Sequence, residues 1–183
     1  MKIKMIRTMI AMSSAALLLA ACITETPRDK VQVGTQRHNE ISALINSSFE
    51  AQNNGDVEGF LNLMYFRSDA PDCVTTARDL YTWMVETMWT EYLDYELYEI
   101  VRINDHIYIA YGMNYFRSGL DEDGEFRYYH EPFNPYIVYF DGTLGLVFTK
   151  ELLPEYLVGN IDDIPDNVEY NPAAISICEI EPI

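Results

Sequence analysis

The chain has 183 residues, of which 29 are acidic and 12 basic, and its formal net charge is −17 at pH 7. So negative a protein is repelled by nucleic-acid phosphates and by anionic lipid, which argues against both as direct partners and leaves a cationic partner open. Its 14 tyrosines and 8 phenylalanines supply apolar surface for a packed core. A chain that is disordered throughout is therefore excluded.

The first 21 residues have the three parts of a secretory signal peptide: a basic start, a short apolar run and small residues before a cleavage point. The basic side chains are Lys2, Lys4 and Arg7. The apolar run, from Met9 to Ala21, is too short for a spanning helix, which needs about 20 apolar residues. We predict that residues 1–21 are removed, which changes the formal charge from −17 to −20 because only three cations leave.

The motif Leu19-Ala20-Ala21-Cys22 resembles the lipobox of bacterial lipoproteins. The resemblance implies cleavage between Ala21 and Cys22 and acylation of Cys22, and several acyl chains on one residue anchor a protein stably. Ile23 in place of Asp resembles the outer-membrane sorting class, so a Gram-negative cell would carry the protein on the periplasmic side of that membrane. The alternative is an ordinary secretory leader followed by an unrelated cysteine.

Residues 22–35 have no helical periodicity and contain Pro27 and Gly34, which is typical of a flexible spacer. The remaining residues, 36–183, are about 150 in number and suit a single domain. From about residue 154 the pattern becomes irregular, with isolated apolar residues such as Ile161, Ile164 and Ile177. We expect a tail there that packs at a few points.

Apolar residues recur at helical spacing from residue 36 to the sequence Asn53-Asn54-Gly55, where glycine favours a helix end. Asp56 is placed to cap a second, shorter helix, because its carboxylate can accept hydrogen bonds from the next turn. A third helix is expected to begin at Thr75 or Thr76 and to run to about Thr90.

From residue 92 onward β-branched and aromatic residues alternate between turn signals, which predicts strands. The expected strands cover residues 92–103, 106–117, 125–131, 136–140 and 143–149. The second has the clearest alternation, with Ile107, Ile109, Tyr111, Met113 and Tyr115 on one face. Hairpin turns at Asn104-Asp105 and Asp141-Gly142 make the sheet antiparallel, and helices followed by such strands indicate an α+β fold.

The segment from Phe49 to Leu61, with its Gly55-Asp56 corner, is followed by a helix that carries tryptophan and by strands rich in tyrosine. It resembles the opening of NTF2-like domains of the SnoaL and ketosteroid isomerase type. The resemblance implies a curved antiparallel sheet that wraps around the helices as a cone with one open mouth. It also implies that homodimers form through the outer surface of the sheet. A cystatin-like fold and an unrelated α+β sandwich are the alternatives.

In NTF2-like enzymes the cone holds an Asp or His base and Tyr or Asp donors that stabilise an oxyanion. Carried over to this chain, the resemblance makes His130, Tyr111, Tyr115 and Tyr139 the candidate pocket residues. Each has a structural alternative, since the tyrosines suit a core and His130 suits an exposed strand end. No motif identifies a catalytic residue. His106 and Asp141 fall at expected turns.

Cys73 and Cys178 remain once Cys22 is acylated, and an even pair in an oxidising compartment predicts a disulfide. It would close a loop of about 100 residues, with a stabilisation of up to about 4.7 kcal/mol. Two separate buried thiols are the alternative. The acidic run from Asp121 to Glu125 does not have EF-hand spacing, and the histidines lack zinc-ligand spacing. We therefore expect neither a metal nor a cofactor.

Three functions fit these observations. The first is an anchored envelope lipoprotein whose domain binds a small apolar molecule or another envelope protein without catalysis. The second is an isomerase or hydratase, which rests on fold analogy. The third is an immunity or inhibitor protein whose acidic surface neutralises a cationic toxin.

Overall fold

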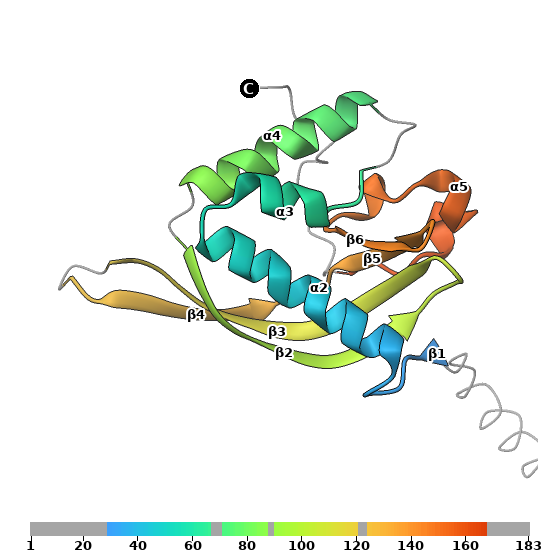
Figure 1. Ribbon diagram of the computed structural model, residues 1–183, viewed down its shortest axis with the longest axis horizontal. Coiled ribbons are helices and arrows are strands. Elements are labelled where there is room, and N and C mark those ends of the chain that lie inside the picture. The colour runs from blue at the N-terminus through green and yellow to red at the C-terminus, as the bar shows by residue number, and fades with distance from the viewer. Residues whose placement is uncertain (1–28, 67–70, 88–89, 121–123, 168–183) are drawn as a thin grey trace, which may run out of the picture.

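A computed structural model describes residues 29–66, 71–87, 90–120 and 124–167. Helices lie against the concave face of a curved antiparallel sheet (Figure 1), so the expected α+β fold is confirmed. The leader with its lipobox, Cys178 and Ile177 lie outside the described residues. Within the described ranges, no helix combines the length and the apolar character needed to cross a membrane.

The first two helices begin and end where the sequence predicts. α2 (Gln36–Asn53) starts after Thr35, whose side chain accepts a hydrogen bond from the His38 amide at 3.4 Å. It ends at Asn54, and Gly55 follows in the left-handed region with a φ of 64°. α3 (Val57–Leu63) is capped by Asp56, whose carboxylate accepts from the Gly59 amide at 2.9 Å.

Replacing Asp56 with alanine should lower the free energy of unfolding by about 1 kcal/mol, because the first turn of α3 loses this side-chain cap. Asp56→Asn retains an acceptor oxygen and should cost less. Urea denaturation of both variants measures the difference. Equal losses for alanine and asparagine would show that the charge of Asp56, rather than its acceptor, stabilises the helix.

α4 (Pro71–Thr87) differs from the expectation, because it begins before Thr75 and Thr76. The hydroxyls of these two threonines donate back to the carbonyls of Pro71 and Asp72, so they lie inside the first turns and do not cap the helix. Proline is favoured at the first position of a helix, so Pro71 was the correct signal for the start of α4. The possible caps at Thr75 and Thr76 drew the predicted start to a later position. The side chains buried on this helix are Cys73, Thr76, Ala77, Tyr81 and Val85.

In the part of the chain that the structure describes, the sheet has six strands, and every pairing between them is antiparallel. The strands are β1 (Asp29–Lys30), β2 (Thr90–Arg102), β3 (Ile107–Leu120), β4 (Phe126–Pro132), β5 (Tyr136–Phe140) and β6 (Thr143–Val147). Their order is β1-β2-β3-β5-β6, and β4 pairs with β3 beside β5. Asp141 and Gly142 form the β5–β6 turn with φ values of 49° and 80°, as a two-residue hairpin requires.

Strand β1 comes from the segment that was expected to be a flexible spacer. Asp29 and Lys30 pair with Arg102 and Val101 at the edge of the sheet, and the Lys30 ammonium forms an ion pair with Glu99. The folded domain therefore begins at or before Asp29. The spacer available to a lipid anchor is correspondingly shorter.

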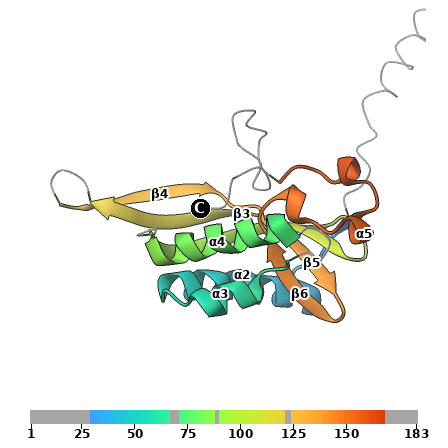
Figure 2. The same cartoon turned by 90° about the horizontal axis from the view of Figure 1, so that it is seen from above.

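Strand β3 has two partners along one of its edges. Its first residues pair with β5, whereas Met113 to Leu120 pair with β4. The second half of β3 and β4 form a long hairpin, which we call the arm, and the arm extends beyond the helices (Figures 1 and 2). Gly112, at the start of the arm, lies where a side chain would overlap the Tyr95 ring. Any larger residue at position 112 would therefore force the Tyr95 ring to move.

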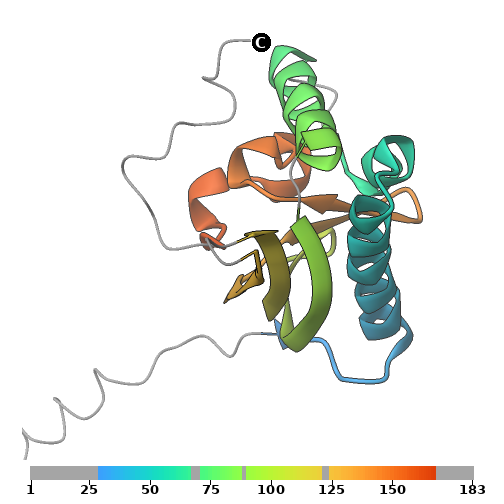
Figure 3. The same cartoon turned by 90° about the vertical axis from the view of Figure 1, so that its left-hand side faces the viewer.

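Residues 148–167 cover the other face of the sheet, opposite α2 (Figure 3). This segment contains three short helices, η1 (Lys150–Leu152), α5 (Glu155–Val158) and η2 (Ile161–Asp163). Asn167 and Asn134 each donate a side-chain hydrogen bond to the backbone carbonyl of the other, at 2.7 and 2.8 Å. Ile164 is buried, so the expected tail is packed as far as Asn167.

Candidate functional site

Aromatic rings fill the space between the helices and the sheet. The Phe49 ring, on α2, lies 4.7 Å from Tyr92, 5.2 Å from Phe133 and 5.7 Å from Tyr95 between ring centroids. Phe148 contacts Phe133 at 5.6 Å and continues the cluster towards α3 and α4. The cluster fills the space between α2 and the concave side of the sheet.

The tyrosine hydroxyls of this cluster are poorly suited to proton transfer. Burial raises the pKa of Tyr92 to about 12, and the negative charge of Glu131 adds to the effect. Burial also raises the pKa values of Tyr81 and Tyr95. The Tyr95 hydroxyl donates to the Phe133 carbonyl at 3.1 Å, so its proton serves a structural contact.

Asn114 was not singled out from the sequence, although it is the most deeply buried polar residue of the arm, at 1% exposure. It lies on the helix-facing side of β3, between Gly112 and Phe116. Its Oδ1 atom is buried without a hydrogen-bond partner. The alternation of β3 could have pointed to Asn114, because one polar residue interrupts a face of small and aromatic residues.

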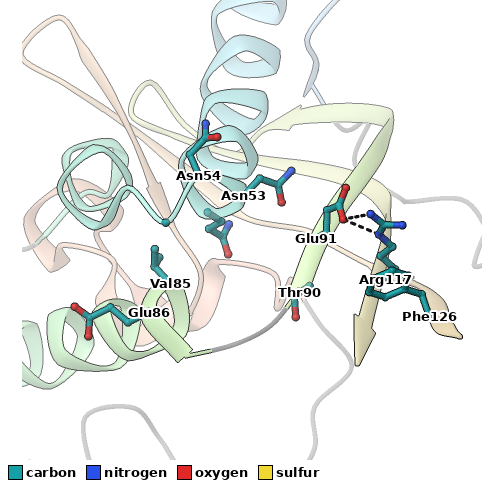
Figure 4. A pocket seen from close by; sticks show the side chains of 10 residues that line it. Asn53, Asn54, Val85, Glu86, Thr90, Glu91, Arg117 and Phe126 are labelled. Atoms are coloured by element: carbon teal, nitrogen blue, oxygen red, sulfur yellow. Dashed lines mark hydrogen bonds and ion pairs between the residues drawn. The ribbon is translucent and has the colours of Figure 1, made fainter. Parts of the chain in front are cut away.

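A first hollow of about 400 Å³ opens where the ends of α2 and α4 lie beside the arm (Figure 4). It is lined by Gln52, Asn53, Asn54 and Gly55 at the end of α2, by Val85 and Glu86 on α4, and by Thr90, Glu91, Arg117 and Phe126 of the sheet. Arg117 forms an ion pair with Glu91, with Nε 2.6 Å from Oε2, and its guanidinium lies 4.2 Å from the Phe126 ring centroid. The cation of this hollow is thus already neutralised.

Asn53 in this hollow has a structural task that the sequence interpretation missed. Its side chain accepts from the Tyr92 amide and donates to the Tyr92 carbonyl, both at 2.8 Å. The two hydrogen bonds copy the pairing of a neighbouring strand and fasten the end of α2 to β2. Asn53-Asn54-Gly55 indicates a helix end, and nothing in this stretch of sequence reveals the contact with Tyr92, 39 residues later.

A second hollow, of about 650 Å³, lies between the first turn of α2 and the β5–β6 hairpin. Arg37 dominates it, with its guanidinium 3.9 Å from the Tyr139 ring centroid and its Nη1 atom 3.1 Å from Oε2 of Glu40. Tyr139 is the single predicted pocket residue among those that line this hollow. Stacking on Tyr139 and pairing with Glu40 both hold Arg37 against the domain.

The other predicted pocket residues lie on the opposite face of the sheet. Tyr115 and His130 are directly opposite each other on β3 and β4, with ring centroids 6.2 Å apart. Tyr111 lies on the same face, towards the C-terminal segment, where Tyr136 donates to the Pro165 carbonyl at 2.7 Å. The four predicted residues therefore do not line one cavity. Alternation correctly placed Tyr111 and Tyr115 on one face, but it could not identify which face is concave.

On this outer face, two tyrosine hydroxyls lie close to one carboxylate. The hydroxyls of Tyr98 and Tyr115 lie 3.4 and 3.3 Å from Oε2 of Glu96. Tyr98 is 54% exposed and Tyr128, two residues before His130, is 68% exposed. We call this surface the acidic tyrosine face; it consists of Asp94, Glu96, Tyr98, Tyr115, Tyr128 and His130.

The predicted disulfide falls partly outside the described residues. Cys73, on the buried side of α4, is disulfide-bonded. Its partner lies outside the described ranges, so the pairing with Cys178 stays a prediction. Acylation of Cys22 also stays a prediction.

No protein-family model matches the sequence, and no curated protein matches it. Solved structures with a similar arrangement include an NTF-2 like protein of unknown function from Shewanella oneidensis MR-1, at 10% identity and a TM-score of 0.41 over 61% of this chain and 94% of that one. A putative calcium/calmodulin dependent protein kinase II association domain from Xanthomonas campestris has 13% identity and a TM-score of 0.43, over 68% and 93%. An uncharacterized protein with a cystatin-like fold from Caulobacter vibrioides has 18% identity and a TM-score of 0.42, over 60% and 83%. These are similarities of chain arrangement, and they assign neither a ligand nor an activity to this protein.

Proposed function

We propose that this protein is a lipid-anchored envelope protein whose domain binds a cationic segment of another protein on the acidic tyrosine face. The observation that carries the proposal is the placement of Glu96 within hydrogen-bonding range of two tyrosine hydroxyls on an exposed sheet surface. A lysine or arginine side chain can stack on an exposed tyrosine ring while its charge is paired by Glu96 and Asp94. A cationic toxin belongs to the same class of partner.

The anchor and the charge of the chain support the same proposal. The lipobox would hold the domain beside a membrane, where its partners are other envelope proteins. A strongly negative domain attracts a cationic segment at long range and speeds its association. The exposed tyrosines add contact area at a small cost in side-chain entropy, because they have few rotatable bonds.

The interior supports binding in preference to catalysis. Phe49, Tyr92, Tyr95 and Phe133 fill the concave side of the sheet. Burial raises the pKa values of the Tyr92 and Tyr95 hydroxyls further above neutral pH. The isomerase alternative and the small apolar ligand both need space there. The hollows of about 400 and 650 Å³ lie at the two ends of α2, and none of these four rings lines either of them.

The proposal is tested by titrating the protein with a fluorescent, lysine- and arginine-rich peptide and measuring anisotropy near 0.15 M salt. Glu96→Gln should weaken binding about fivefold, because a close, partly desolvated charge contact contributes about 1 kcal/mol. Tyr98→Ala should weaken it by a similar factor through the loss of ring contact.

Glu58→Gln is the matched control, because Glu58 is exposed on α3 and the substitution changes the net charge equally. This control should bind within about twofold of the wild type, since screening limits the reach of a distant charge to roughly 8 Å. An equal loss for Glu58→Gln and Glu96→Gln would contradict a defined site. So would the absence of measurable peptide binding.

A further inference from the structure

Among the strands that the structure describes, β4 pairs with β3 alone and has an exposed edge. It pairs with β3 and lies off the path that joins the other strands, and all seven of its residues are exposed. It runs along the arm, which projects beyond the helices (Figures 1 and 2), so the described helices do not cover it. A strand edge of this kind presents free backbone donors and acceptors and can pair with another strand.

The register shows which amides face the free edge. The Phe133 amide donates to the Gly112 carbonyl at 3.1 Å, so that pair is hydrogen-bonded. Hydrogen-bonded and non-bonded pairs alternate in an antiparallel ladder, so Arg127, Tyr129 and Glu131 direct their backbone groups towards β3. The backbone groups of Tyr128 and His130 consequently point away from the sheet.

The sequence of β4, Phe-Arg-Tyr-Tyr-His-Glu-Pro, is complementary to itself when it is read in the opposite direction. If two copies pair antiparallel about Tyr129, Arg127 of each copy lies directly opposite Glu131 of the other. Tyr128 then lies opposite His130, and these are the residues whose backbone groups are free. Opposite charges and aromatic residues at facing positions both stabilise an antiparallel pair.

We propose that two copies of this protein associate edge to edge through β4, around a two-fold axis at Tyr129. Sliding the pair by two residues either way separates Arg127 from Glu131, so these charges are paired only in the register centred on Tyr129. The charges thus select one register. The arms hold the two negatively charged bodies apart, which limits their repulsion because salt screens it over roughly 8 Å.

The arrangement differs from the dimer implied by the NTF2-like resemblance, which would use the outer face of the sheet. Facing residues in a ladder point to the same side, so edge pairing leaves both acidic tyrosine faces open on one side of a continuous sheet. The proposal does not depend on the proposed binding of a cationic segment, because association is measured without any partner.

Disulfide cross-linking of the full-length protein in the bacterial envelope tests this geometry. Tyr129 of one copy would lie opposite Tyr129 of the other copy, at a non-hydrogen-bonded position. The Cα atoms of such a pair are about 4.5 Å apart, which allows a disulfide to form. Tyr129→Cys should therefore give a covalent dimer on a non-reducing gel. Tyr98→Cys is the matched control, because Tyr98 is exposed on the outer face and away from β4.

Reversing the charges of Arg127 and Glu131 in the Tyr129→Cys variant tests whether their pairing sets the register. Arg127→Glu or Glu131→Arg alone should reduce the cross-linked fraction about tenfold, because each places two like-charge pairs across the axis. The double variant, Arg127→Glu with Glu131→Arg, should restore it. Thermal unfolding of each variant checks that the domain remains folded.

Several outcomes would overturn the proposal. Cross-linking through Tyr98→Cys but not Tyr129→Cys would place the dimer on the outer face. Failure of both to cross-link in folded protein would show that β4 stays unpaired, with Arg127, Glu131 and Pro132 protecting the edge. Equal cross-linking of the single and double charge variants would reject the register.

Discussion

Cys22→Ala is expected to move the protein almost completely from the membrane fraction to the soluble fraction of the envelope. The acyl chains on Cys22 would be the only strong attraction to lipid, because the mature chain has a formal charge of −20 and is repelled by anionic membranes. Each buried methylene of an acyl chain contributes about 0.8 kcal/mol, so loss of all the chains removes stable anchoring. Fractionation followed by immunoblotting measures the distribution.

The folded domain should be unaffected by this change. Cys22 precedes β1, and the described contacts begin at Asp29, which pairs with Arg102. The circular dichroism spectrum and the urea midpoint of Cys22→Ala should therefore match those of the delipidated wild type. If Cys22→Ala stays with the membrane, the anchor is elsewhere and the lipobox interpretation is wrong.

Ile23→Asp is the matched control for position. It leaves Cys22 available for acylation, so membrane association should remain. In a Gram-negative cell with enterobacterial-type sorting, the lipobox resemblance implies retention in the inner membrane. Separation of the two membranes on a sucrose gradient distinguishes this relocation from a loss of anchoring.

Local signals predicted those parts of the fold that local interactions determine. The start of α3 follows from the carboxylate of Asp56, and the β5–β6 turn follows from the backbone freedom of Gly142 beside Asp141. The strand boundaries came out within a few residues of the structure, because β-branched and aromatic residues alternate between such turns. A cap or a two-residue turn involves only neighbours in the chain, and the sequence displays it directly.

Tertiary contacts decided what the sequence left open. Tyr115 and Tyr139 are similar residues on similar strands, yet Tyr115 lies on the outer face whereas Tyr139 stacks under Arg37 of α2. A period of two places residues on alternating faces but does not say which face the helices cover. The acidic tyrosine face also depends on Glu96 meeting Tyr115, a contact across two strands that appears only when β2 and β3 are in register.

Phe49→Ala is expected to lower the free energy of unfolding by about 3–5 kcal/mol, the usual cost of removing a buried ring. Phe49 is 7% exposed and contacts Tyr92, Tyr95 and Phe133, so its loss opens a cavity between α2 and the sheet. The free energy of unfolding of a domain is typically about 5–15 kcal/mol, so this one substitution would remove a large part of it. Urea denaturation at pH 7 measures the change.

Phe140→Ala is the comparison for a ring of the same size at the surface. The Phe140 ring is 42% exposed and makes edge contacts with Tyr65 and Tyr156, so its removal should cost about 1 kcal/mol or less. The ratio of the two effects reports how tightly the concave side is filled. If Phe49→Ala costs no more than Phe140→Ala, the concave side can collapse or take up solvent at little cost, and a ligand chamber inside the sheet becomes the better interpretation. A loss of several kcal/mol for Phe49→Ala instead requires a solid core there, and binding must then occur on the outside of the domain.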